Sequence, residues 1–297
     1  MPPADPELVK VARVRMSHEY TDSTLYMRLS KTVGEGSPFA GVLIQLSATE
    51  NKHYEFWRRY VPGEQPKLDK LKLYWILVLR RILGLTFASR YLDRHEASVV
   101  KEYQAIAGMI PEGDRAAFED MVADEKEHEN EFAHKVESSA VRYISFIVLG
   151  LADALVEISG IHAGSLGIYQ RTELAGIAGI VAGAAASLAM ASAAYAQAKQ
   201  GFEGSAKLSA VYTGVSYFIS AVFLATPYFL TGSMVYAVSS SLVVAVLLLA
   251  FTTYYSTVIS NKPFMKDFLE ILLILLGATV ALYLFGTFIH VETGITA

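Results

Sequence analysis

The sequence predicts an all-α protein in which a bundle of four helices is followed by five membrane-spanning helices. The first supporting observation is the distribution of charge over the 297 residues. Residues 1–140 carry 22 Asp and Glu and 19 Lys and Arg, whereas residues 141–297 carry only 7 and 6. The second observation is that apolar residues recur at helical spacing in the first part and form long stretches in the second. We therefore predict a soluble domain over residues 1–140 and a transmembrane domain over residues 141–297.

Composition excludes several classes of protein and site. The net charge is −4 and no basic stripe is present, so nucleic-acid binding is not expected. The absence of cysteine excludes disulfides, cysteine nucleophiles and thiolate metal sites. The N-terminus lacks a basic region followed by an apolar core, and so does not resemble a signal peptide. We expect the first domain to stay on the side of the membrane where the chain is made.

Proline and glycine divide the first domain into helices, with breaks near residues 34–38, 61–63 and 110–114. The four main helices are expected at about 6–33, 38–60, 84–109 and 113–138. A further apolar and basic helical segment, residues 66–83, joins the second helix to the third. Its role stays open between packing on the bundle, contact with a second subunit and contact with the membrane surface.

An internal repeat selects candidate metal ligands in these helices. The stretch from Ala48 to His53 contains Glu50-x-x-His53, and the stretch from Ala123 to His128 contains Glu125-x-x-His128 at an offset of 75 residues. Similarly, His18-Glu19 recurs as His95-Glu96 at an offset of 77 residues. The first and second helices therefore resemble the third and fourth.

The repeated residue types suit a site for two metal ions. Glu at position i and His at i+3 project from the same helix face, and carboxylates can bridge two cations while imidazoles complete the coordination. This is the carboxylate-bridged di-iron pattern, so we expect iron, with manganese or zinc as alternatives. The predicted ligands are Glu19, Glu50, His53, Glu96, Glu125 and His128. Other candidates nearby are Glu102, Glu131 and His134.

Five stretches of the second domain are long enough to span a bilayer. They cover residues of about 141–168, 174–198, 208–230, 232–257 and 267–290, with a kink expected at Pro227. One side of the membrane receives Arg142, Lys199, Lys207, Lys262 and Lys266, whereas the other receives only Arg171. The positive-inside rule then places the first domain in the cytoplasm and the C-terminus outside.

Ionisable residues mark the first of these spans. Asp153 and Glu157 lie four residues apart and share one helix face. Such residues are costly at membrane depth, which favours cation binding or proton transfer over a structural role. Met190 in the second span offers a thioether ligand, and His162 is a minor candidate near the outer end of the first span.

At this point the sequence resembles two known families. Residues 7–138 resemble the rubrerythrin and ferritin-like superfamily through the six predicted ligands. Residues 141–290 resemble the vacuolar iron transporter family through the stretches Gly150–Glu157 and Ala189–Tyr195. Together they are similar to the membrane-bound ferritins of prokaryotes. In two places the sequence departs from the transporter pattern: the family's Asp-Gly is Asp153-Ala154, and its second-span acid is Ala194.

The resemblance implies export of Fe²⁺, with Mn²⁺ as a second substrate, across the cytoplasmic membrane in exchange for protons. It also implies a homodimer and pathway roles for Asp153 and Met190, with Tyr195, the aromatic residue of the second-span motif, as a further candidate. The ferritin-like domain would capture, sense or oxidise the metal, the last being a ferroxidase activity. The alternatives are a membrane-anchored di-iron oxidase or peroxidase, or an iron sensor without transport.

Overall fold

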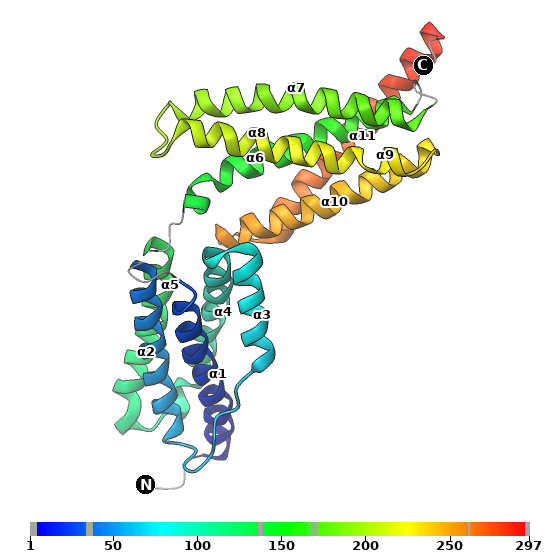
Figure 1. Cartoon of the computed structure of the whole chain (residues 1–297). Helices are drawn as coiled ribbons and strands as arrows, with labels where there is room; N and C mark the ends of the chain where they lie inside the picture. The colour runs from blue at the N-terminus through cyan, green and yellow to red at the C-terminus, as the bar shows by residue number, and fades with distance from the viewer. Residues whose placement is uncertain are drawn as a thin grey trace. The chain divides into compact units, whose positions relative to one another are not determined.

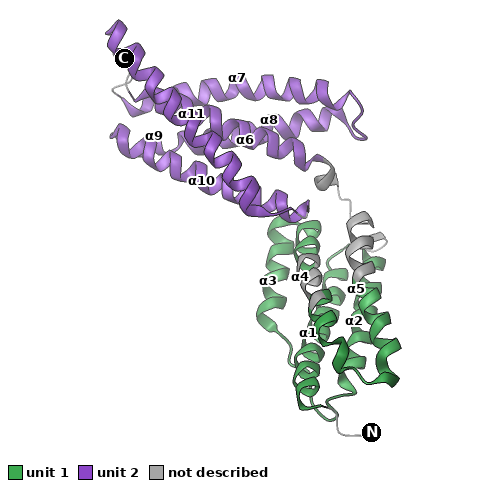
Figure 2. Cartoon of the chain, turned by 180° about the vertical axis from the view of Figure 1, so that it is seen from behind, with its two compact units in different colours: residues 1–138 green, residues 139–297 purple. Residues whose placement is uncertain are grey.

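The computed structural model describes residues 5–33, 38–135, 139–166, 168, 171–260 and 262–294, and within them the side chains other than those of 38, 93–98, 101, 126–135 and 139–142. These residues form eleven α-helices and two short 3₁₀-helices and contain no strand, which confirms the all-α prediction. The chain divides into two compact units, residues 1–138 and residues 139–297 (Figure 2). The sequence predicts this division at residue 140, two residues later.

Four long helices and one shorter helix form unit 1 (Figure 1). They are α1 (Pro6–Ser30), α2 (Pro38–Arg58), α3 (Lys70–Leu83), α4 (Leu85–Ile106) and α5 (Arg115–Lys135). Helices α1, α2 and α4 end earlier, and α4 and α5 begin later, than the sequence predicts, because the turns at these ends tighten or break. Residues 107–109 and 112–114 are 3₁₀ turns, and Gly84 has a φ of 92° that excludes it from α4.

Helical periodicity in α1 turns the candidate ligand Glu19 inward. Helix α1 begins at Pro6, where the Asp5 side chain accepts a hydrogen bond from the Glu7 N–H at 2.8 Å. From there Ala12, Met16 and Glu19 recur on one buried face. The same apolar face that packs α1 into the bundle therefore carries Glu19 into its interior.

An aromatic core surrounds this interior. Trp57 of α2 lies with its ring centroid 5.8 Å from that of Tyr103 of α4, and Tyr103 lies 5.7 Å from Phe118 of α5. Trp57 and Tyr103 are fully buried. Aromatic pairs at these separations add to the hydrophobic stabilisation, by about 0.5–1.5 kcal/mol each. The core thus fixes α2, α4 and α5 against one another next to the candidate ligands.

Unit 2 contains five candidate spans, which confirms the predicted number of spanning stretches and gives the chain the character of a multi-pass membrane protein. Their helices are α6 (Ser139–Ser165), α7 (Thr172–Ala198), α8 (Ala206–Ala225) continued by α9 (Pro227–Leu230), α10 (Met234–Ile259) and α11 (Phe264–Thr293). The helix is interrupted between α8 and α9 at the residue where a kink was expected, because Pro227 cannot donate the hydrogen bond that would continue α8.

Small residues allow the helices of unit 2 to approach closely. A Cβ at Gly150 of α6 would lie 2.3 Å from the Thr213 carbonyl oxygen of α8, and a Cβ at Gly183 of α7 would lie 2.5 Å from the Ala221 Cβ of α8. The Thr213 hydroxyl donates to the Phe146 carbonyl oxygen at 3.0 Å. Helix α8 is therefore held between α6 and α7 by close packing and by an interhelical hydrogen bond.

Candidate metal centre

Three helices of unit 1 bring together four buried side chains with metal-ligand chemistry. Glu19 comes from α1, Glu50 and His53 come from α2, and Glu125 comes from α5. One potential ligand atom from each lies within 4.8 Å of all the others. Each of the four residues is at most 4% exposed. The structure therefore assembles four of the six ligands predicted from the sequence.

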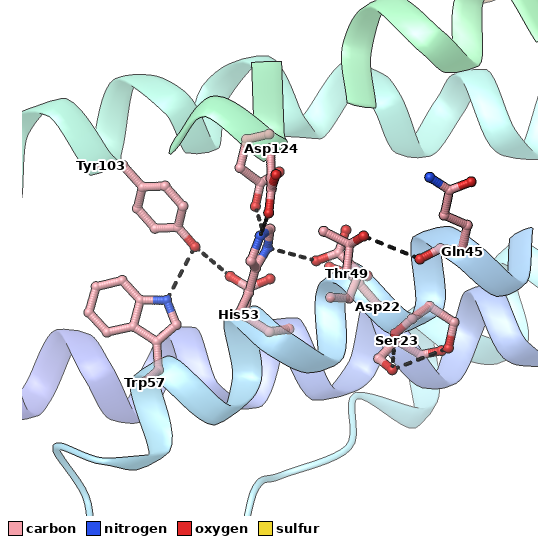
Figure 3. A network of polar contacts seen from close by, with 12 residues as sticks. Asp22, Ser23, Gln45, Thr49, His53, Trp57, Tyr103 and Asp124 are labelled. Carbon is pink, nitrogen blue, oxygen red and sulfur yellow. Dashed lines mark hydrogen bonds and ion pairs between the residues drawn. The ribbon is translucent and has the colours of Figure 1, made fainter. Parts of the chain in front are cut away.

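The imidazole of His53 lies among the carboxylates of this cluster. Its Nδ1 is 3.2 Å from Glu125 Oε1 and 3.5 Å from Glu50 Oε2. Its Nε2 is 3.5 Å from Asp124 Oδ2, a contact that Figure 3 shows beside the labelled ring of His53. Asp124 precedes Glu125 on α5 and is partly exposed, so it lies at the outer edge of the cluster.

The electrostatics of the cluster favour a cation. Burial, together with the neighbouring Glu125, raises the pKa of Glu19 from 4.5 to about 7. The same two causes raise the pKa of Glu50 well above 4.5. Burial lowers the pKa of His53, but contacts with Glu125 and Glu50 outweigh it and raise that pKa well above 6.5. Protons therefore balance the crowded carboxylates in the metal-free state, and a divalent cation can replace them.

A buried tyrosine orients one of the candidate ligands. The Tyr103 hydroxyl donates to Glu19 Oε1 at 2.5 Å. It also accepts from Trp57 Nε1 at 3.4 Å, the contact drawn as a dashed line between the two labelled rings in Figure 3. Burial and the nearby Glu19 raise the pKa of Tyr103 well above 10, so the phenol remains a donor. Our sequence reasoning did not include these two residues. The signal was present, because Trp57 follows His53 by four residues and Tyr103 follows Glu96 by seven.

Glu102, which the sequence offered as an alternative ligand, is engaged elsewhere. Its carboxylate pairs with the guanidinium of Arg15, and its side chain is 61% exposed. The physical reason is helix geometry, because Glu102 is turned by about 100° from the adjacent Tyr103, whose hydroxyl reaches Glu19. Arg15 is buried and lies with its guanidinium carbon 5.0 Å from the Tyr103 ring centroid. Glu102 thus neutralises the buried Arg15 and does not join the cluster.

A cavity of about 300 Å³ opens beside the cluster. Glu19, Glu50 and Glu125 line it together with the basic residues Arg15 and Lys72. Lys72 of α3 pairs with Asp22 of α1 at 2.6 Å. The cavity, which Asp22 and Glu102 also line, therefore leaves space for a small polar molecule or an ion beside the candidate ligands.

Four predicted residues have side chains that lie outside the described part of the structure. They are Glu96 on α4 and Glu131, His128 and His134 on α5. Their roles as ligands stay predictions. His18, which precedes Glu19 in the repeated pair, is exposed.

The two acids of the first span of unit 2, Asp153 and Glu157, differ in their surroundings. Asp153 is half-buried, whereas Glu157 is exposed on the surface of the single chain. The Tyr217 hydroxyl of α8 donates to Glu157 Oε2 at 2.5 Å. This contact between helices could not be anticipated from spacing along the sequence.

The other pathway candidates of unit 2 have apolar or peripheral surroundings. Met190 of α7 packs against the apolar cluster that includes Ala154 and Leu155 of α6. Tyr195 is 37% exposed, and Lys199 Nζ lies 5.3 Å from its ring centroid. His162 is buried, with its ring centroid 4.1 Å from that of Tyr228.

Comparison with known proteins gives no match. No protein-family model, no curated protein and no solved structure is significantly similar to this chain.

Proposed function

We propose that this protein is a transition-metal transporter that exports Fe²⁺, and secondarily Mn²⁺, from the cytoplasm in exchange for protons. The observation that carries the proposal is the buried cluster of Glu19, Glu50, His53 and Glu125 in a chain that also has five candidate spans. A transporter combines a membrane path with acids that bind a cation. A merely structural bundle has no need for three buried carboxylates around one imidazole.

The donor set of unit 1 fits a transition metal. Three carboxylates and one imidazole are suitable ligands for Fe²⁺ or Mn²⁺, and their atoms already lie within 4.8 Å of one another. Glu96 and His128 are the predicted remaining ligands for a second ion. Bound iron would supply redox chemistry at this position, while Tyr103 holds Glu19 and the neighbouring cavity admits small molecules. In this proposal, unit 1 captures, senses or oxidises the metal on the cytoplasmic side.

The acids of unit 2 support the proposed path. Asp153 and Glu157 share one face of α6, so a cation or a proton can pass between them. The hydrogen bond from Tyr217 fixes the Glu157 carboxylate. The proposed orientation, with unit 1 in the cytoplasm, rests on the distribution of Lys and Arg in the loops. A homodimer would enclose the exposed Glu157 if the path lies between subunits.

The test is Fe²⁺ flux into proteoliposomes that carry a pH gradient. We expect gradient-dependent flux in the wild type and none in Asp153→Asn, because the amide cannot exchange a proton for the cation. Glu173→Gln is the control, since Glu173 is an exposed acid in the first turn of α7. Flux that persists in Asp153→Asn would contradict the assigned pathway, and absence of flux in the wild type would contradict transport.

One observation favours a second candidate, a membrane-anchored oxidase or peroxidase. Tyr103 and Trp57 form a buried hydrogen-bonded chain that ends on the candidate ligand Glu19, and such aromatic side chains can pass electrons. Metal-dependent consumption of O₂ or peroxide by the full-length protein, without any ion flux, would favour this candidate.

A further inference from the structure

Helix α3 presents a continuous apolar face to solvent. Leu71 is 82% exposed and Ile82 is 72% exposed, with Tyr74, Trp75 and Val78 exposed between them. At 100° per residue these five side chains lie on one side of the helix. We call this surface the α3 face. Five large exposed apolar residues on 14 residues of helix form a patch of the kind that marks an interaction site.

The α3 face does not contribute to the packing of α3 against the other helices of unit 1. The opposite side of the helix buries Leu73, Ile76 and Leu79. Polar contacts fix the helix near both ends: Lys72 Nζ lies 2.6 Å from Asp22 Oδ1, and Arg80 Nε donates to Thr32 Oγ1 at 3.2 Å. These contacts fix the orientation of α3, and the α3 face stays exposed.

The charges of α3 are all positive. Residues 70–83 contain Lys70, Lys72, Arg80 and Arg81 and contain no Asp or Glu. Lys72 contacts Asp22 and Arg80 contacts Thr32. The other two, Lys70 and Arg81, are exposed. Helix geometry places both of these along the same edge of the α3 face, the edge formed by Tyr74. The exposed surface of α3 thus combines aromatic and aliphatic side chains with a basic edge.

We propose that the α3 face lies on an anionic lipid bilayer, with its apolar side chains at the boundary between headgroups and acyl chains. Trp75 and Tyr74 are the residue types that favour this boundary, and Lys70 and Arg81 complement anionic headgroups. The chain itself supplies the proximity, because unit 2 has five candidate spans. The inference rests on those spans and not on the proposed transport.

A second copy of the chain fits this face less well. If two α3 faces met as antiparallel helices related by a two-fold axis, their basic edges would lie together, and α3 carries no acid that could pair with them. Attachment to the bilayer instead places the basic edge beside opposite charges. Its consequence is that the metal centre of unit 1 is kept at the membrane surface.

The two tryptophans of the chain allow a direct test. Trp57 is fully buried in unit 1, whereas Trp75 is 52% exposed on the α3 face. Full-length protein is reconstituted into bilayers of mixed anionic and zwitterionic lipid with brominated acyl chains, and tryptophan emission is compared with that of Trp75→Phe. The difference reports Trp75. We expect bromine to quench about half of this component, since interfacial helices bury their apolar face by about 5–10 Å.

The matched control moves the tryptophan to another surface of unit 1. Ile44 on α2 is 49% exposed, so Ile44→Trp in the Trp75→Phe background presents a tryptophan of similar exposure. We expect no quenching there. Replacing both Lys70 and Arg81 with Gln, or raising the salt concentration, should reduce quenching of Trp75.

Two outcomes would overturn the proposal. One is quenching of Trp75 no greater than that of the Ile44→Trp control. The other is disulfide cross-linking of Val78→Cys between copies, with Trp75 unquenched, which would identify a second copy as the occupant. The wild-type chain has no cysteine, so this single thiol is unambiguous.

Discussion

The acids of unit 1 and those of unit 2 are arranged in opposite ways. In unit 1, Glu19, Glu50 and Glu125 come from three helices and are buried around His53. In unit 2, Asp153 and Glu157 come from one helix, and Glu157 is exposed with Tyr217 as its hydrogen-bond partner. Several fixed donors suit an ion that stays bound, whereas a few accessible donors suit an ion that passes. Under the proposed function, unit 1 holds a resident metal and unit 2 a transient one.

The largest expected effect is that a substitution in one unit abolishes the function of that unit and leaves the other unit unchanged. Asp153→Asn should reduce Fe²⁺ flux to background while unit 1 keeps its full metal content. Glu50→Gln should remove metal from unit 1, because it withdraws a buried carboxylate, and should leave Asp153 able to carry ions. Flux in proteoliposomes and metal content by elemental analysis give the two readouts.

The control for the second variant is Glu55→Gln, which changes an exposed acid of the same helix. If Asp153→Asn also strips unit 1 of metal, the two sites are not separate and the comparison fails.

The second prediction concerns the imidazole of the cluster. His53→Ala should weaken binding of Fe²⁺ or Mn²⁺ to unit 1 by at least about 100-fold, because loss of a direct ligand should cost more than loss of a supporting group. Titration of the metal-free, full-length protein measures the affinity. Asn51→Ala, on an exposed position of α2, is expected to bind as the wild type does. An unchanged affinity in His53→Ala would exclude His53 as a ligand.

The third prediction sharpens the role of Tyr103. Tyr103→Phe removes the hydrogen bond to Glu19 but keeps the ring that packs on Trp57. We expect metal affinity to fall by about 10- to 100-fold, which is the usual cost of losing a group that orients a ligand. Tyr74→Phe, on an exposed tyrosine of α3, provides the control. Equal affinities for the two variants would show that Tyr103 only fills space.

The smallest effect is a change in the pH dependence of stability. The pKa of Glu19 is about 7 in the folded, metal-free protein and 4.5 in the unfolded chain, so folding takes up a proton between these values. Its contribution to stability is therefore present below pH 4.5 and is lost as the pH rises to about 7. The raised pKa of His53 acts in the same direction above pH 6.5.

Metal should reverse this trend, because the ligands bind it in their deprotonated forms. The measurement is the thermal unfolding midpoint of unit 1, followed by Trp57 emission in Trp75→Phe between pH 5 and 8. The midpoint should fall with pH in the metal-free protein, and the increase produced by metal should grow. A midpoint of the metal-free protein that rises over this range would contradict the buried, proton-linked cluster.

Much of the fold was predictable because its signals are local. Stretches of apolar residues long enough to cross a bilayer identify the five spans, and Pro227 breaks α8 for a reason that involves one residue and its own backbone. Likewise, Glu50-x-x-His53 defines a common helix face before any packing is known. The helix ends were less accurate, since tightening of the last turn at residues 107–109 has no clear sequence signature.

Contacts between helices could not be predicted in the same way. Pairing of Glu102 with Arg15 removes a candidate ligand, and the hydrogen bond from Tyr217 to Glu157 adds a residue to the candidate path. Each depends on how two helices are rotated against each other. That rotation is set by packing of the whole core, which spacing along one helix does not contain.

The sequence by itself determined that this chain is helical, that it has a charged part and a membrane-spanning part, and that Glu19, Glu50, His53 and Glu125 are candidate ligands. These follow from composition and helical period, which are properties of single segments. Only the tertiary structure decided that these four side chains meet in one buried cluster, that Tyr103 holds Glu19, and that α3 turns Leu71, Trp75 and Ile82 outward. The reason is that burial and proximity arise when several helices exclude water from a shared interior.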